Sequence, residues 1–245
     1  MSFFGTTDFM LEVAKGNVPG HTAKFIIGRN TDVGTTYENV SGAGAAGIDA
    51  FPAAAETWEI ISDNVNDAAA GTGAQAVFIV SLDANYEEQG QVVILNGTTA
   101  VTLTGTHIRS DQSTVIAAGS SGFNEGTLTI RDASSTDTRS TILPEISESQ
   151  DGRVTVPANK TGYLFDINPW FPKNEDGSVQ TKIKPEGADS AIITSLTFPF
   201  YQNAFNIPIT AKTQIPEKTD GWFDAKSTNG STEVIVTSSF LLVDN

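Results

Sequence analysis

The chain has 245 residues and a formal net charge of −15, because 29 Asp and Glu outnumber 14 Lys and Arg. This charge opposes binding to nucleic acid and to anionic membrane surfaces, since both carry negative groups. Cysteine is absent, which excludes disulfides, thiolate metal sites and cysteine nucleophiles, and no apolar run is long enough to predict a transmembrane helix.

Residues 1–56 predict two short strands followed by a long loop or arm. Apolar runs at Phe9–Val13 and Thr22–Ile27 each end at a glycine-containing turn. Residues 30–55 are rich in Gly, Ala and Asn, which predicts a loop with little packing of its own apart from one helical turn near 53–56. Loops of this length in compact domains tend to contact partners. The first residues do not resemble a signal peptide, so we expect folding in a cytoplasm.

Residues 57–148 predict a first block of β-sandwich. Asn96-Gly97 separates two β-branched runs, and Asn-Gly adopts the positive φ angles of a type I′ turn, so this pair predicts a hairpin. The strands expected in this block are 57–62, 75–82, 90–95, 100–109, 113–117, 127–131 and 138–143.

Residues 149–245 predict a second block, after a polar and acidic boundary or crossover at 145–152. Asp176-Gly177 and Asn229-Gly230 predict further hairpin turns. The strands expected here are 153–156, 162–167, 179–184, 191–198, 206–211, 221–226 and 233–243. Short strands at this spacing predict an all-β fold, an antiparallel β-sandwich or jelly-roll-like architecture, as one sandwich or two packed blocks.

The sequence offers weak signals for catalysis or metal binding. Residues 42–47 match GxGxxG, but no buried strand precedes them and Pro52 follows, so a flexible loop is favoured over a dinucleotide site. The oxygen-rich run 62–67 lacks the spacing of a calcium loop and favours an ordinary Asx-rich turn. His21 and His107 have no motif around them. We therefore predict no catalytic, cofactor or metal site, and a protein that is not an enzyme.

Aromatic clusters are the strongest candidates for an interaction surface. Trp170 and Phe171 lie between two prolines, Tyr201 follows Phe198-Pro199-Phe200, and Trp222 precedes Phe223. Exposed Trp and Tyr suit a protein interface or the stacking of a sugar, whereas the alternative is that these rings fill the core. We name Trp170, Phe171, Tyr201 and Trp222 as the candidate surface.

Several motifs across nearly the whole chain resemble a family of tailed-bacteriophage virion proteins common in marine phage genomes. They are GRNTDVGTT at 28–36, NDAAAGTGAQ at 66–75, LDANY at 82–86, LNGTTAV at 95–101, VPANKTGYL at 156–164 and IPEKTD at 215–220. The resemblance implies a structural protein of the virion, and it supplies no catalytic or binding residues.

The first hypothesis is a non-enzymatic phage structural protein of the virion: a capsid decoration protein, fibre base or neck or tail adaptor. It would be made in the bacterial cytoplasm, assemble as a homo-oligomer and contact other virion proteins. The N-terminal segment and the Gly/Ala loop would clamp neighbouring subunits. The alternative is a module of the virion that binds host-surface glycan or another receptor through the aromatic clusters. A hydrolase of host polysaccharide is a third hypothesis.

Overall fold

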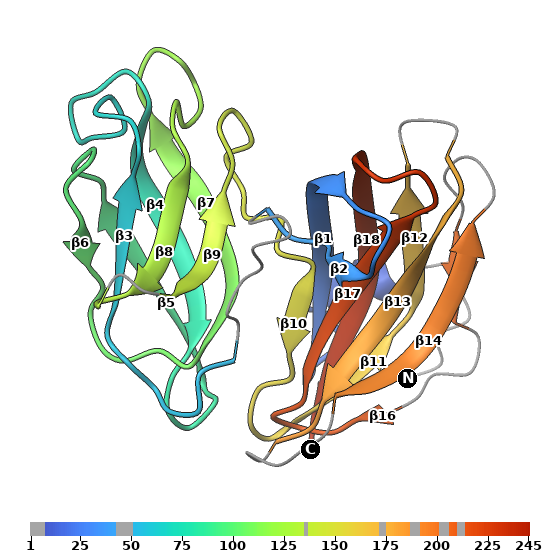
Figure 1. Ribbon diagram of the computed structural model, residues 1–245. Helices are drawn as coiled ribbons and strands as arrows, with labels where there is room; N and C mark the ends of the chain where they lie inside the picture. Colours follow the sequence, from blue (N-terminus) through green and yellow to red (C-terminus); the bar gives the residue numbers. More distant parts are fainter. Residues whose placement is uncertain are drawn as a thin grey trace.

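The computed structural model describes residues 8–42, 51–134, 137–171, 175–186, 192–200, 206–209 and 214–245. Apart from the short helix α1 (Phe9–Ala14), the elements within these ranges are strands, and all of their pairings are antiparallel. The predicted all-β sandwich fold is therefore confirmed. The strands form two sandwiches, which we call the first and second lobes (Figure 1).

The first lobe contains two sheets. One has the order β6-β3-β8-β9 and the other β5-β4-β7. Their bounds are β3 (Trp58–Ser62), β4 (Ala74–Leu82), β5 (Glu88–Ile94), β6 (Val101–Thr102), β7 (Arg109–Ala118), β8 (Leu128–Asp132) and β9 (Thr138–Ile142). Alternate residues of each strand point inward, so Trp58 and Ile130 of one sheet meet Val77 and Ile79 of the other in a fully buried core.

The second lobe also has two sheets, with β18 and β17 at their centres. Strand β18 pairs with β1 on one side and with β11 and β12 on the other, and β16 and β15 flank these. The other sheet has the order β10-β17-β13-β14, with β2 also on β17. The bounds are β1 (His21–Val33), β2 (Glu38–Asn39), β10 (Arg153–Thr155), β11 (Lys160–Leu164), β12 (Asp166–Trp170), β13 (Gly177–Lys184), β14 (Ile193–Phe200), β15 (Ile207–Pro208), β16 (Gln214–Ile215), β17 (Asp220–Ser227) and β18 (Thr232–Asp244).

The chain returns to its beginning to complete the second lobe. Strands β1 and β2 come from the segment predicted as strands and arm, yet they pair with β18 and β17 near the C-terminus. Residues 30–33 and 38–39, predicted as loop, are therefore strand, whereas 43–50 and with them most of the GxGxxG motif lie outside the described residues. The division into 1–56, 57–148 and 149–245 stays a prediction.

Three Asx-Gly pairs do not form hairpins, contrary to prediction. Asn96-Gly97 joins β5 to β6, which belong to opposite sheets of the first lobe, and Asn229-Gly230 joins β17 to β18 of opposite sheets in the second. The turns themselves exist, because Gly97 has φ +59° and Gly230 has φ +75°. Asp176-Gly177 lies at the start of β13, whose first residue is Gly177, and β13 pairs with β14 and β17 and not with the preceding β12. Local turn chemistry fixed the reversal but not the sheet that the next strand joins.

Two other element predictions were wrong. Residues 9–13 form helix α1 instead of a strand, because Asp8 caps the helix by accepting a hydrogen bond from the Met10 backbone at 3.0 Å. A short apolar run has no periodicity that separates the two structures. The predicted strand 100–109 is reduced to β6, since the chain then crosses to the other sheet and β7 begins at Arg109.

Candidate functional site

An extended segment at residues 147–151 connects one sheet of each lobe. On one side, the Val115 backbone of β7 donates to the Ser147 carbonyl at 2.8 Å and Thr114 bridges to Glu148. On the other side, the Arg29 backbone of β1 donates to the Gln150 carbonyl at 3.1 Å and Gly28 bridges to Asp151. The sheet β5-β4-β7 therefore continues through this segment into the sheet that holds β1 and β18. The polar and acidic stretch 145–152, predicted as a boundary or crossover, runs from β9 of the first lobe to β10 of the second and bridges to both lobes on the way.

A buried ion pair fixes the orientation of the two lobes. Arg109 of β7 donates from Nε to Oδ1 of Asp220 at 2.8 Å and from Nη2 to Oδ2 at 3.0 Å, and Asp220 begins β17 of the second lobe. Both side chains are less than 10 % exposed. The guanidinium also lies over the rings of Phe51 and Tyr86, and its Nη1 donates to the Pro52 carbonyl at 3.0 Å. Such a bidentate pair with further hydrogen bonds resists hinge motion.

Two further charged contacts cross the junction. Lys24 of β1 donates to Glu88 of β5 at 2.8 Å and to Asp111 of β7. Burial of the Lys24 ammonium lowers its pKa, but the two carboxylates outweigh this effect and hold the pKa above its ordinary value. Ser140 of β9 donates to Asp151 at 2.6 Å, and burial raises the pKa of that carboxyl despite the nearby Arg153. The lobes thus form one body.

An apolar face covers the outer surface of the sheet β5-β4-β7. Four large side chains on it are between 38 % and 55 % exposed, namely Phe78, Val92, Ile94 and Ile116, and we call these four residues the apolar face. Phe78 and Val92 are direct cross-strand partners, and their neighbours Val77 and Val93 point into the core instead. Contiguous exposed apolar patches of this kind mark interaction sites more often than scattered residues do.

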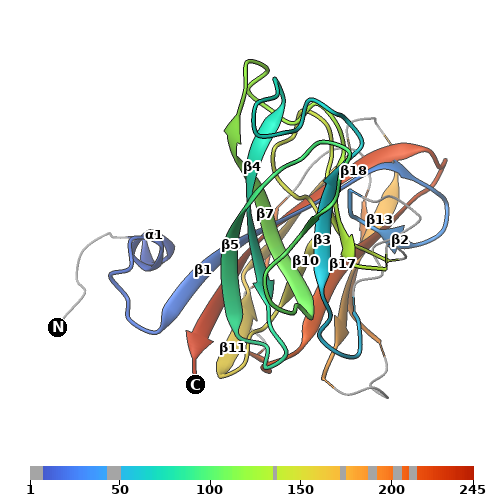
Figure 2. The ribbon, with the colours of Figure 1, turned by 90° about the vertical axis from the view of Figure 1, so that its left-hand side faces the viewer.

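Helix α1 carries a second exposed apolar group. Phe9 is 47 % and Leu11 49 % exposed, whereas Val13 is buried and the Phe9 ring stands edge-on against His21 of β1 at 5.9 Å. Figure 2 shows α1 projecting beyond the end of β1, away from the body of the second lobe. Phe9, whose ring contacts His21, and the buried Val13 lie one turn apart on the flank that attaches the helix, whereas Leu11 lies on the opposite flank and faces solvent.

The apolar face and α1 lie on the same side of the molecule. In Figure 2, β5, β4 and β7 lie toward the same side as α1, and β3 and β17 lie toward the other. Phe25 of β1 is also exposed on this side, since its neighbour Ile26 points into the core of the second lobe. Of eleven large apolar side chains exposed among the described residues, eight belong to α1 and to the outer surfaces of these two connected sheets: Phe9, Leu11, Phe25, Phe78, Val92, Ile94, Ile116 and Trp170.

The aromatic residues predicted from sequence do not form one surface. Trp170 is 41 % exposed on β12, whereas Phe171 is 2 % exposed in the core, 5.5 Å from the Phe200 ring. Trp222 belongs to the opposite sheet, where its ring packs 5.0 Å from Phe51 and its Nε1 donates to Asp224 at 3.1 Å. Tyr201 lies outside the described residues. A role of this group in binding stays a prediction, but Trp170 and Trp222 occupy different sheets.

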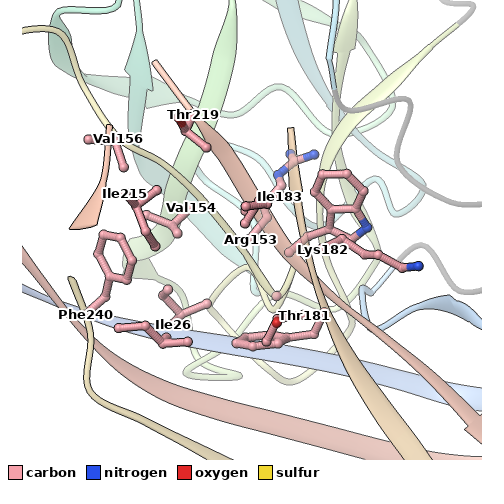
Figure 3. Close-up of a pocket in the computed structure, with 15 residues that line it drawn as sticks. Ile26, Arg153, Val154, Val156, Thr181, Lys182, Ile183, Ile215, Thr219 and Phe240 are labelled. Carbon is pink, nitrogen blue, oxygen red and sulfur yellow. The ribbon is translucent and has the colours of Figure 1, made fainter. Parts of the chain in front are cut away.

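Two cavities of the second lobe have mainly apolar linings. Figure 3 shows one of about 40 Å³ between the two sheets, with Ile26, Val154, Ile183 and Phe240 around it. A wider cleft of about 410 Å³ opens between β14 and the strands β15 and β16, and Leu196, Phe198 and Ile207 line it.

The weak chemical signals of the sequence have structural explanations. In the run 62–67, Asn64 accepts from the Asn66 backbone at 2.9 Å as an Asx turn, and buried Asp67 accepts from the Ala74 and Gly126 backbones. His107 is fully buried, stacks on Trp58 and bonds Ser81 at 2.8 Å. Across the described ranges, no group of three or more His, Asp or Glu side chains is placed to hold a metal ion. Within the same ranges, no helix is long and apolar enough to cross a membrane.

Sequence reasoning missed the apolar face. Strands β4 and β5 were predicted from their β-branched content. Their runs Val77-Phe78-Ile79 and Val92-Val93-Ile94 are apolar at every position and show no alternation of apolar and polar residues. Such runs are typical of strands buried on both faces, so they gave no sign that one face is open. The signal that could have found the apolar face is a continuous apolar run in a strand whose outer surface no other element of the fold covers.

Comparisons with known proteins give no family. No family model and no curated protein matches the sequence. Among solved structures, the tandem CBM22 domain of Xyn10C from Paenibacillus barcinonensis is 11 % identical with a TM-score of 0.24, covering 92 % of this chain and 94 % of its own. The VP2 subviral particle of infectious bursal disease virus is 10 % identical with a TM-score of 0.24, covering 91 % and 72 %. At these TM-scores neither likeness bears on fold or function.

Proposed function

We propose that this protein is a non-enzymatic structural component of a bacteriophage virion that acts through protein–protein contacts. The observation that carries the proposal is the concentration of exposed apolar side chains on one side of a rigid two-lobed body. Exposed apolar area costs about 25 cal/mol per Å² relative to burial, so a contiguous patch of this kind favours contact with a partner. The sequence motifs resemble those of phage virion proteins, so the proposed particle is a bacteriophage virion.

The net charge fits an assembly component. A charge of −15 keeps free subunits apart in the cytoplasm, since like charges repel over the Debye length. The four side chains of the apolar face are uncharged, and Glu88 on the same surface of β5 is paired with Lys24, so contact can form there without burying an unpaired charge. Assembly through this side therefore avoids the like-charge repulsion that prevents association through the rest of the surface.

The assembly role is favoured over glycan binding. A sugar-binding platform needs aromatic rings that share one exposed surface. Trp170 and Trp222 lie on different sheets, and the Trp222 ring is packed against Phe51. The side chains of the apolar face are mostly aliphatic, which suits protein contact better than stacking on a sugar ring.

The test is the composition of the particle. Particles of a phage that encodes this chain are purified on a density gradient, and their proteins are quantified by mass spectrometry alongside a map from electron microscopy. We expect stoichiometric copies of the chain and density that fits its two lobes. Particles that contain no copies, although infected cells express the chain, would overturn the proposal.

A further inference from the structure

We propose that two copies of this chain form a two-fold dimer in which helix α1 of each copy docks on the apolar face of the other. This inference rests on the proposed assembly role and names its partner as a second copy. Both contact surfaces are present on every chain and both lie on the same side of it (Figure 2). A two-fold axis between two facing molecules therefore brings each helix onto the partner's face in a closed arrangement.

The helix does not cover its own apolar face in this structure. It packs against β1 of the second lobe through Phe9 and His21, whereas the apolar face belongs to the first lobe. The ion pairs of Arg109 with Asp220 and of Lys24 with Asp111 hold the lobes in place. Leu11, on the flank opposite Phe9 and Val13, is 49 % exposed and is available to another molecule.

Area explains why the helix and face act together. Strand β4 has nine residues, so the three-stranded sheet offers a footprint of roughly 400 Å² at about 3.3 Å per residue and 4.8 Å between strands. A stable interface buries about 800 Å² on each partner. The outer surface of this sheet alone reaches about half of this area. Reciprocal docking of α1, together with the exposed Phe25 of β1, supplies further area.

Charge at the ends of the sheet favours the crossed arrangement. Glu88 and Asp111 lie at one end of β5 and β7, and Lys24 already pairs with both. Direct stacking of two faces in parallel would bring these acidic ends together, which a chain of charge −15 disfavours. Docking of α1 brings two carboxylates near the apolar face, and both are hydrogen-bonded within the helix: Glu12 accepts from Lys15 and Asn17, and Asp8 accepts from the Met10 backbone.

The experiment measures the mass of the purified full chain by light scattering over a range of concentrations. The wild type is expected to form dimers. Leu11→Asp on the helix and Ile116→Asp on the face should each raise the dimer dissociation constant about tenfold or more, because each buries a charge in an apolar contact. Ile193→Asp is the matched control, since Ile193 is 47 % exposed on β14 of the opposite sheet and should leave the dimer unchanged.

Mixing the two defective variants is the decisive step. A Leu11→Asp chain keeps a sound face and an Ile116→Asp chain keeps a sound helix, so their mixture should form heterodimers through one intact contact. Circular dichroism confirms that each variant is folded. A monomeric wild type, a dimer that survives Leu11→Asp, or a mixture without heterodimers would overturn the inference. If particles still contain the chain after such a result, the assembly role stands with a different partner.

Discussion

At the scale of single residues, the junction between the lobes depends on one buried ion pair. Arg109 and Asp220 share two hydrogen bonds, and Thr155 donates a third to Asp220 at 2.7 Å. Removal of either partner leaves a charge buried without compensation, which costs about 3–5 kcal/mol. The pair therefore has more effect on stability than an exposed salt bridge such as that between Lys15 and Glu12.

Chemical denaturation tests this with Arg109→Met, Asp220→Asn and the double variant. Each single change should lower the free energy of unfolding by about 3–5 kcal/mol, and the double variant should lose much less than the sum. Lys15→Met is the control and should change stability by less than about 0.5 kcal/mol. Additive losses in the double variant would mean that the two side chains act independently.

His107 should make stability depend on pH. Burial against Trp58 lowers its pKa below the ordinary value of 6.5, with a hydrogen bond to the Thr104 backbone as a smaller opposing effect. As the pH falls through about 6.5, His107 becomes protonated in the unfolded chain but stays neutral in the folded chain. The free energy of unfolding therefore decreases until the pH reaches the lower pKa that His107 has in the folded chain. Above that window the contribution is constant.

Thermal melts of wild type and His107→Gln at pH 7.5 and pH 5 give the comparison. The wild type should lose more stability between these two pH values than the variant does, because the variant lacks the imidazole of His107. An equal loss in both proteins would show that other groups control the pH dependence.

The candidate residues could be predicted only in part. The Asx turn at 62–67 followed from spacing, whereas the full burial of His107, whose Nε2 has no hydrogen-bond partner among the described residues, could not be predicted from its lack of a motif. Whether Trp170 and Trp222 share a surface could not be predicted, because the sequence does not say which sheet a strand joins. Phe171 and Trp170 are neighbours in the chain, yet one is buried and the other exposed, as strand alternation requires.

At the scale of elements, the turn at Asn96-Gly97 is under a stricter constraint than its sequence suggests. Gly97 has φ +59°, and a Cβ there would lie 2.9 Å from the Val65 carbonyl oxygen. Gly122 has φ +79° with no atom within 4 Å of such a Cβ. The two glycines share the backbone requirement but differ in space, so they form a matched pair.

Gly97→Ala should destabilise the protein by clearly more than Gly122→Ala. The left-handed conformation costs about 1–2 kcal/mol in both variants, and the contact with Val65 adds to the cost at Gly97 alone. Denaturant titrations of the two variants measure the difference. Equal losses of stability in the two variants would mean that the segment around Val65 moves away from the added methyl group without lowering the free energy of unfolding.

Most strands could be predicted from alternation and β-branched content, but their pairing could not. The Asx-Gly pairs marked reversals correctly at residues 97 and 230, while the flanking strands entered opposite sheets. Pairing of β1 with β18 joins residues more than 200 positions apart, and no local pattern reports such a contact. Helix α1 was missed because its capping Asp8 precedes a run too short to show a period.

At the scale of the whole molecule, contacts between the two lobes hold them in one arrangement. The segment 147–151 connects the sheets of the two lobes, the ion pairs lock them, and exposed apolar side chains gather on the resulting surface. The composition excluded cysteine chemistry and disfavoured nucleic acid, and the motif resemblance pointed to a virion. The side that we propose contacts a partner could be identified only from the structure, which places the exposed surfaces of both sheets next to each other.

The absence of native cysteine allows the docking of α1 to be measured directly. Leu11→Cys is combined in turn with Val92→Cys, Ile94→Cys or Ile116→Cys, the chains are oxidised mildly, and non-reducing electrophoresis detects covalent dimers. We predict rapid cross-linking in at least one double variant and little in the four single variants. Contradiction would come from double variants that cross-link no faster than Leu11→Cys alone, or from face cysteines that cross-link equally well without the helix cysteine.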